Sequence, residues 1–402
     1  MAWFYAAEWP TFAPPLTIQT GTYARRHQVW DFNTPLPEPL RPITYARLLR
    51  QHGYRTGYFG KYGIGDNSKA TKEVLADFDE YRSFDEYYTA DDTARQWHHN
   101  RRISDLAQRF LRHSPAEHPF CLTLGFKAPH AKDDGDPVMG PYVSEPDMLQ
   151  LYEHDIFRRG TTMNEQAFAT LPPYIQKSEA RHRWEQRFSN DALWQDSVHK
   201  YFGLVSGMDR AIGQILDMLE ASGQLDNTMI VFSSDNGYML GDYGLEGKWF
   251  GYEASIRVPL LISPPGGTRG QDVAAPVLNV DLAPTMLHMA GMAVPSRMQG
   301  KDLSPLFGGK PPADWRKDFL YEHYLPKLYS YSAGMESFLP SSEGVRGERY
   351  TYLRYPRQPG ANEMLFDRQN DPDELRNLAK TADPALMTAM RRRTDELIAK
   401  GS

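Results

Sequence analysis

Residues 233–265 read SSDNGYMLGDYGLEGKWFGYEASIRVPLLISPP, and this stretch decides the fold. It begins directly after the apolar run MIVF at residues 229–232, which is typical of a buried strand. A second apolar run, residues 258–262, lies near its end and stops at the prolines. The stretch therefore predicts two buried strands, with the polar pair Asp235-Asn236 at the carboxyl end of the first.

The side chains of Asp235 and Asn236 offer oxygen atoms, which are the ligands that Ca²⁺ and Mg²⁺ prefer. An isolated Asp-Asn-Gly is also a common turn sequence, since Asp and Asn bond their own backbone and Gly permits a positive φ. Two interpretations therefore stand at this point: part of a cation site, or a turn with no ligand.

Two more strands end in polar residues. Residues 56–60 lead to Lys61, and residues 120–126 are followed by Lys-Ala-Pro and His130. Continuous apolar strands that alternate with helices indicate an α/β protein whose sheet is covered on both faces. Because ligands of such sheets bind beyond the carboxyl ends of the strands, we expect Lys61, His130, Asp235 and Asn236 to converge there.

The pattern divides the chain into two parts. Residues 1–312 form a predicted main domain, interrupted at about 135–200 by a segment without strand and helix alternation, which we interpret as an insertion. Residues 313–402 form a predicted small α+β subdomain. Its short antiparallel strands are expected at residues 318–324, 344–355 and 363–367, with a closing helix at about 384–400.

Composition excludes several classes of protein. The formal charge of −6 over 402 residues argues against a nucleic-acid partner. No window approaches the roughly 18 consecutive apolar residues of a transmembrane helix. The first residues lack the features of a signal peptide, so the sequence as written predicts a cytoplasmic location. The one cysteine excludes a disulfide within the chain.

Residues 233–265 closely resemble the metal-binding signature of the sulfatase family, within the alkaline phosphatase superfamily. Four more segments resemble family segments in the same order, so the similarity extends over about residues 20–379. They read LLRQHGYRTGYFGKYGIGD, PFCLTLGFKAPH, APVLNVDLAPTMLHMAGM and EMLFDRQNDPDELRNLA.

The resemblance implies an alkaline-phosphatase-like α/β fold: a large mixed sheet between helices, with a small C-terminal α+β subdomain that carries an antiparallel sheet. It also implies a sulfuric ester hydrolase, which acts on a small-molecule or carbohydrate sulfate ester with the help of Ca²⁺ or Mg²⁺. Members of the family are often periplasmic or secreted.

The resemblance also assigns roles to individual residues. It makes Asp235 and Asn236 cation ligands, and it places Lys248 on a sulfate oxygen. It gives Lys61 the neutralisation of charge near the nucleophile. It makes His130 an acid or base, or a hydrogen-bond donor to the sulfate. Fixed cations suit this chemistry because the sulfuryl group carries spread negative charge during transfer.

The chain departs from the family pattern at the nucleophile and at the metal site. The family converts Cys or Ser into formylglycine, but the matching position holds Thr11 or, with a one-residue shift, Phe12. The Asp-Asp pair of the family's first strand has no counterpart before Thr11, so we expect an incomplete cation site. Smaller departures are Gly63 and Tyr243, where His is common in the family.

Three interpretations follow from these departures. In the first, the natural chain is longer and supplies the missing carboxylates. In the second, the protein is a pseudo-sulfatase that binds a sulfated ligand or a partner without turnover. In the third, Thr11 acts directly as a hydroxyl nucleophile, as in phosphodiesterase relatives of the superfamily. A hydroxyl nucleophile needs activation by a metal or a base.

Overall fold

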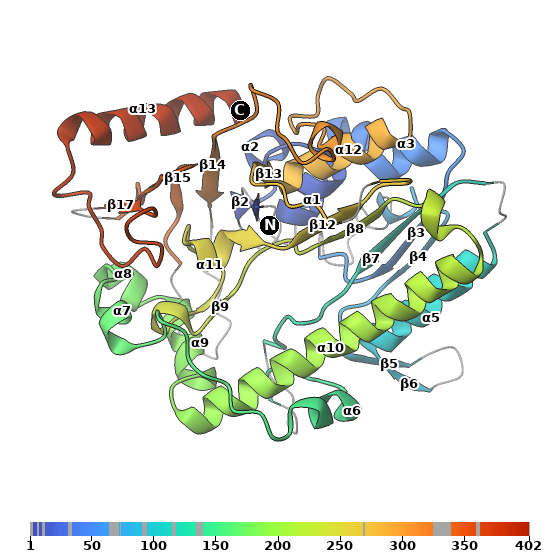
Figure 1. Cartoon of the computed structure of the whole chain (residues 1–402), viewed down its shortest axis with the longest axis horizontal. Coiled ribbons are helices and arrows are strands. Elements are labelled where there is room, and N and C mark those ends of the chain that lie inside the picture. Colours follow the sequence, from blue (N-terminus) through green and yellow to red (C-terminus); the bar gives the residue numbers. More distant parts are fainter. Residues whose placement is uncertain are drawn as a thin grey trace. The chain divides into compact units, whose positions relative to one another are not determined.

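The computed structural model describes residues 3–5, 8–9, 13–30, 34–63, 72, 74–90, 95–114, 118–133, 140–267, 270–324, 339–358 and 362–401 (Figure 1). The chain forms two compact units. The first comprises Met1–Tyr45, Arg159–Glu185 and Met229–Ser402, and the second comprises Ala46–Arg158 and Gln186–Thr228. This division differs from the boundary at residue 312 that the sequence suggested, and that boundary stays a prediction.

The second unit contains a parallel sheet of three strands with β3 (Arg55–Gly60) at its centre. β3 pairs with β4 (Glu80–Ser83) on one side and with β7 (Phe120–Gly125) on the other. The helix α3 (Tyr45–Gln51) leads into β3, and Gly53 follows it with a φ of +86°. The strands predicted at residues 56–60 and 120–126 are thus confirmed.

Two helices of the second unit lie alongside each other, α5 (His99–Arg112) and α10 (Asp191–Ala221) (Figure 1). α5 also packs on β3 at Gly57, where an added Cβ would lie 2.9 Å from the ring of Phe110. α10 begins inside the segment that the sequence analysis assigned to an insertion, because Asn190 caps it there and accepts from the Leu193 amide at 3.0 Å. The other described elements of this unit are β5 (Tyr88–Ala90), β6 (Gln96–His98), α6 (Pro146–Leu149), η2 (Gln150–Tyr152) and η3 (Leu225–Asn227).

The first unit holds the strands of the signature stretch. β8 (Ile230–Ser233) pairs antiparallel with β12 (Leu260–Ser263). Pro259 separates β12 from β11 (Arg257–Val258), because a proline has no N–H for the strand ladder. The single strand expected at residues 258–262 is therefore two strands. β11 pairs instead with β1 (Trp3–Tyr5), which also pairs in parallel with β13 (Pro276–Leu278).

The C-terminal part of the first unit forms an antiparallel sheet in the order β17-β16-β15-β14, which β2 (Glu8–Trp9) extends in parallel. Residues 344–355 fold into a hairpin of two strands, rather than the single strand expected. α13 packs on this sheet, and its Arg393 forms a bidentate ion pair with Asp318 at 2.7 and 2.8 Å. The elements are β14 (Asp318–His323), β15 (Ser342–Gly347), β16 (Tyr350–Arg354), β17 (Glu363–Asp367) and α13 (Pro384–Gly401). The α/β class with a C-terminal antiparallel sheet is confirmed.

The remaining described elements of the first unit are short. They are α1 (Ala13–Thr20), α2 (Ala24–His27), η1 (Glu38–Ile43), α7 (Glu165–Ala169), α8 (Pro173–Gln176), α9 (Glu179–Arg187), β9 (Met239–Leu240), η4 (Asp242–Gly244), β10 (Glu246–Gly247), α11 (Glu253–Ile256), η5 (Asn279–Asp281), α12 (Leu282–Met289) and η6 (Ser304–Leu306).

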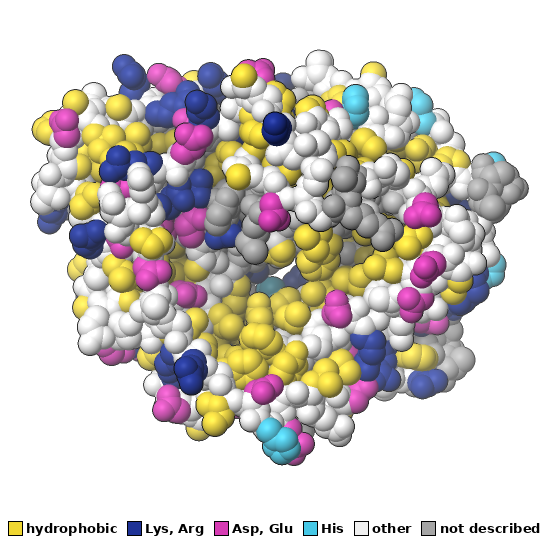
Figure 2. All heavy atoms as spheres, viewed as in Figure 1, with side chains coloured by type: hydrophobic (Ala, Val, Ile, Leu, Met, Phe, Trp, Pro, Cys, Tyr) yellow, Lys and Arg dark blue, Asp and Glu magenta, His cyan; other side chains and the backbone are white. Residues whose placement is uncertain are grey.

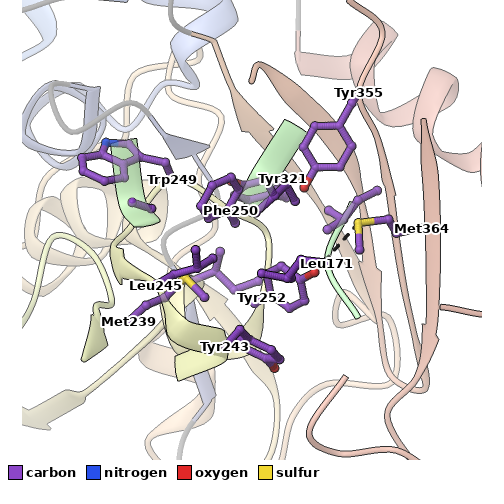
Figure 3. Packing of buried hydrophobic residues seen from close by; sticks show 14 of the residues in the cluster. Leu171, Met239, Tyr243, Leu245, Trp249, Phe250, Tyr252, Tyr321, Tyr355 and Met364 are labelled. Carbon is purple, nitrogen blue, oxygen red and sulfur yellow. Dashed lines mark hydrogen bonds between the residues drawn. The ribbon is translucent and has the colours of Figure 1, made fainter. Parts of the chain in front are cut away.

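An aromatic core joins the signature stretch to the C-terminal sheet within the first unit (Figure 3). The rings of Tyr243 and Tyr252 pack against each other in a tilted arrangement, with their centroids 4.6 Å apart. The hydroxyl of Tyr252 points to the sulfur of Met364 on β17, 3.9 Å away. Aromatic rings bury large areas, so this core holds residues 243–252 in a fixed conformation.

Glu374 is a buried carboxyl at the edge of this core. It is 2% exposed, and its Oε2 accepts a hydrogen bond from the backbone N–H of Glu253 at 2.9 Å. Burial and, to a lesser extent, the nearby carboxylate of Glu253 raise the pKa of Glu374 to about 7. The charged form of Glu374 is therefore disfavoured in the folded protein.

Glu374 is expected to make the protein less stable as the pH rises. Between its ordinary pKa of 4.5 and about 7, the folded protein holds a proton that the unfolded chain has released. The stability that the protonated Glu374 contributes to the folded protein is thus fully present below pH 4.5, and it is lost as the pH rises through 7. Glu374→Gln, which stays neutral and keeps the acceptor, should stabilise the protein by about 1–3 kcal/mol at pH 8 and by nearly nothing at pH 4.5.

Urea unfolding at the two pH values measures this difference. The matched control is Glu348→Gln at an exposed glutamate in the β15–β16 turn, which should show no such pH dependence. An equal effect of Glu374→Gln at both pH values would contradict the expectation.

The described surface gives two further observations. On the face drawn in Figure 2, basic and acidic side chains are interspersed, without a continuous field of one sign. Among the described residues, no helix combines the length and the apolar character that crossing a bilayer requires.

Candidate active site

The Asp235-Asn236 turn is held by a hydrogen bond within the turn and by a backbone contact to α11. The Ser234 hydroxyl donates to the carbonyl of Asn236 at 2.7 Å, and the Gly237 N–H donates to the carbonyl of Ser255 at 3.0 Å. An added Cβ at Gly237 would lie 2.6 Å from that carbonyl oxygen, so only glycine allows this close approach. Asp235 itself is exposed. The turn is therefore rigid, with its carboxylate accessible from solvent.

Lys248 lies beside this turn. It follows the β9–β10 hairpin, at whose end Gly247 has a φ of +115°. Lys248 is only 6% exposed, and its Nζ donates to the Oδ1 of Asn236 at 3.4 Å. The next residues, Trp249 and Phe250, lie in the aromatic core of Figure 3 and fix the backbone. Because water is largely excluded, the charge of Lys248 acts more strongly on a nearby anion than a surface lysine would.

Asp235 and Asn236 fit part of a cation site. Together they offer carboxylate and amide oxygens, whereas Ca²⁺ takes about six to eight oxygen ligands. In the part of the chain that the structure describes, no group of three or more His, Cys, Asp or Glu side chains is placed to hold a metal ion. The described residues thus do not complete such a site.

Lys61 and His130 lie at one edge of the sheet in the second unit. β3 and β7 run in parallel with Gly60 opposite Gly125, so both strands end at the same level. The Lys61 N–H donates to the carbonyl of Gly125 at 2.8 Å. The turn that carries His130 follows β7, and its N–H donates to the carbonyl of Lys127 at 2.8 Å. The carboxyl ends of β3 and β7 are therefore adjacent, with Lys61 and His130 in the turns that follow them.

The tautomer of His130 follows from its neighbours. Its Nδ1 lies 2.5 Å from the backbone oxygen of Ala131, which can only accept, so Nδ1 carries a proton. The hydroxyl of Tyr87 donates to the carbonyl of His130 and holds the same turn. The ring nitrogen that can exchange a proton with a substrate is therefore Nε2.

Two charged residues at this edge were missed by the sequence analysis. Lys127 is 9% exposed, and its Nζ lies 3.2 Å from Oδ1 of Asp85. Its position three residues before His130, at a strand end, was the signal that could have found it. Asp85 follows β4 and gives no comparable signal in the sequence. Cys121 on β7 is not a candidate nucleophile, because burial raises the pKa of its thiol to about 12.

The predicted site residues are divided between the units. Asp235, Asn236 and Lys248 belong to the first unit, which brings the last two into contact. Lys61 and His130 belong to the second. Thr11 lies outside the described residues. The convergence of all these residues on one site stays a prediction.

Two family profiles match the chain. The profile described as sulfatase matches residues 17–292, and the profile of the C-terminal part of N-sulphoglucosamine sulphohydrolase matches residues 241–400. The first covers more than half of the chain. The chain belongs to the sulfatase family. It is a sulfuric ester hydrolase by family, in the alkaline phosphatase superfamily, and this family generally uses a divalent cation.

Similar proteins agree with this assignment. The N-acetylglucosamine-6-O-sulfatase of Bacteroides thetaiotaomicron is 27% identical over 401 residues, which cover 85% of this chain and 69% of that protein. The multifunctional alkaline phosphatase superfamily protein PehA of Trinickia caryophylli is 34% identical over 293 residues, which cover 68% of this chain and 54% of that protein.

A solved structure extends the likeness to the whole fold. It shows a protein in complex with its substrate D-glucosamine-2-N,6-O-disulfate, and it matches with a TM-score of 0.78 at 23% identity. The match covers 100% of this chain and 90% of that one. The alkaline-phosphatase-like fold implied by the resemblance is confirmed.

Proposed function

We propose that this chain hydrolyses a sulfate ester of a carbohydrate, with the ammonium of Lys248 in contact with a sulfate oxygen. The observation that carries the proposal is the buried Lys248 beside Asn236, inside the signature stretch. The carbohydrate part is supported by the sulfatase of N-acetylglucosamine among the relatives and by the glucosamine disulfate in the similar structure.

Hydrolysis forms one bond to sulfur and breaks another. A nucleophilic oxygen attacks sulfur, the bond between sulfur and the ester oxygen breaks, and the sugar alkoxide takes up a proton. Lys248 would stabilise the negative charge that the sulfuryl oxygens carry during this transfer. His130 would deliver the proton to the leaving oxygen from Nε2, while Nδ1 keeps its own proton and donates it in a hydrogen bond to the carbonyl of Ala131.

We further infer that Ca²⁺ or Mg²⁺ binds at Asp235 and Asn236. The support is the donor set, since carboxylate and amide oxygens suit these ions. When bound, the ion would supply positive charge next to the sulfate. The described residues supply only part of its ligands, so no step above depends on it.

Two other functions stay open because the nucleophile position holds Thr11 or Phe12 instead of Cys or Ser. A protein without a nucleophile would bind a sulfated ligand and release nothing. A threonine nucleophile would instead suit a phosphodiester-type hydrolase of the superfamily.

An assay of free sulfate released from N-acetylglucosamine 6-sulfate distinguishes the proposed hydrolysis from the two alternatives. We expect the wild-type chain to release sulfate, with more release in Ca²⁺ than in EDTA. Loss of release in Thr11→Ala would identify the threonine as the nucleophile, and unchanged release would exclude it. A rise in melting temperature with the sulfated sugar, but no release, would favour the binding protein. Neither release nor a shift would refute the proposed function.

A further inference from the structure

Asp85 lies between two lysine ammonium groups at the edge of the sheet in the second unit. Its Oδ1 is 3.2 Å from Nζ of Lys127 and 3.5 Å from Nζ of Lys61. The resemblance to the family gives Lys61 the neutralisation of charge near the nucleophile, whereas neither Lys127 nor Asp85 has a role in the function proposed above. The cluster as a whole keeps a net positive charge, since two ammonium groups face one carboxylate.

Lys127 anchors the segment that carries Asp85. Its Nζ also donates to the backbone carbonyl of Asp85 at 2.5 Å, and it lies over the ring of Tyr87, 5.1 Å from the centroid. The side chain of Lys127 is 9% exposed, whereas that of Asp85 is 60% exposed. The buried ammonium of Lys127 thus makes three contacts, with the carboxylate and the backbone carbonyl of Asp85 and with the ring of Tyr87. These contacts determine where the exposed carboxylate of Asp85 lies.

Lys61 needs such a partner. The ammonium of a lysine sits at the end of a flexible four-carbon stem, so the side chain loses considerable rotamer entropy when the ammonium is fixed. The side chain of Lys61 is 26% exposed, so packing alone leaves it freedom. Lys127 holds the carboxylate of Asp85 in place. The carboxylate in turn attracts the Lys61 ammonium and keeps it at the end of the sheet where His130 also lies.

We propose that Asp85 is a positioning residue: with Lys127 as its anchor, its carboxylate holds the ammonium of Lys61 in the orientation that receives the anionic substrate. The link to substrate rests on the proposed function. The link from Asp85 to Lys61 rests on the two distances alone, and the two links can be tested separately.

Acetylation by acetic anhydride, followed residue by residue with mass spectrometry, tests the link to Lys61 without any substrate. Asp85→Asn should raise the acetylation rate of Lys61 at least threefold, and Asp85→Glu should stay near the wild-type rate. The matched control is Asp196→Asn, which removes the partner of Lys200 at 2.7 Å on α10 and should raise the rate of Lys200 only. An unchanged rate of Lys61 in Asp85→Asn would overturn the proposal.

Titration with inorganic sulfate tests the link to the anion. Loss of a negative charge by itself would tighten sulfate binding, whereas loss of positioning weakens it. We expect the dissociation constant for sulfate to rise several-fold in Asp85→Asn, with partial recovery in Asp85→Glu and no change in Asp196→Asn. Tighter or equal binding in Asp85→Asn would overturn the positioning role. No sulfate binding by the wild type would instead refute the proposed function, while the acetylation result still decides the role of Asp85.

Discussion

Lys248→Ala is expected to lower kcat/KM for a sulfate ester by about 100- to 1,000-fold, the usual effect of removing one preorganised stabilising group from a catalytic site. The reason is the position of the ammonium, which is 6% exposed and fixed beside Asn236 by the neighbouring aromatic core. A buried charge cannot be replaced by a hydrated ion or by another mobile side chain. Steady-state release of sulfate measures the effect.

Two variants keep this test interpretable. Lys248→Met retains most of the side-chain volume and removes only the charge, so it should fold and show the same loss. Lys301→Ala removes a lysine of the same unit whose Nζ donates to the carbonyl of Asp314 at 3.4 Å, and it should leave kcat/KM unchanged. An activity of Lys248→Met within a factor of three of the wild type would show that Lys248 does not contact the sulfate.

Arg316→Ala is expected to cost about 3–5 kcal/mol of folding stability, because it leaves a buried carboxylate without its counter-ion. That carboxylate belongs to Asp281, which is fully buried. Asp281 forms a bidentate pair with Arg316, and it also accepts from the backbone N–H groups of Leu278 and Lys301 at 2.8 and 2.7 Å. These contacts tie β13 to residues 301 and 316, so the loss should destabilise this part of the first unit.

The control is a surface pair in the same unit. Arg391 and Glu363 also form a bidentate pair, but the arginine side chain is 47% exposed, so Arg391→Ala should cost less than about 1 kcal/mol. Urea unfolding followed by circular dichroism compares the two variants. Equal losses would mean that burial does not govern the strength of the Asp281–Arg316 pair.

Much of the fold follows from local patterns in the sequence. The strand before Asp235, the strand before Lys61 and the closing helix near residue 384 all have continuous apolar runs or helical spacing, and all three are present. The errors have local causes as well. Pro259 divides one predicted strand into two, and the Glu348-Arg349 turn divides another. The start of α10 within residues 135–200 was not predicted, because its buried positions include Ser197, which interrupts the apolar pattern.

The site follows from the sequence less completely. The resemblance identified Asn236 and Lys248, but their contact depends on the positive φ of Gly247 and on the core around Trp249. The cluster of Asp85 with Lys61 and Lys127 depends on tertiary structure alone. Three strands bring these residues to one edge of a sheet, and no periodic pattern in the sequence encodes that arrangement.

The most direct test of sulfate ester hydrolysis is the reaction of N-acetylglucosamine 6-sulfate in H₂¹⁸O, with mass analysis of both products. Attack at sulfur predicts that each sulfate released by the wild-type chain carries one ¹⁸O, that the sugar carries none, and that Lys248→Met releases almost no sulfate. A failure to form sulfate, or the label in the sugar hydroxyl, would contradict hydrolysis at sulfur by this protein.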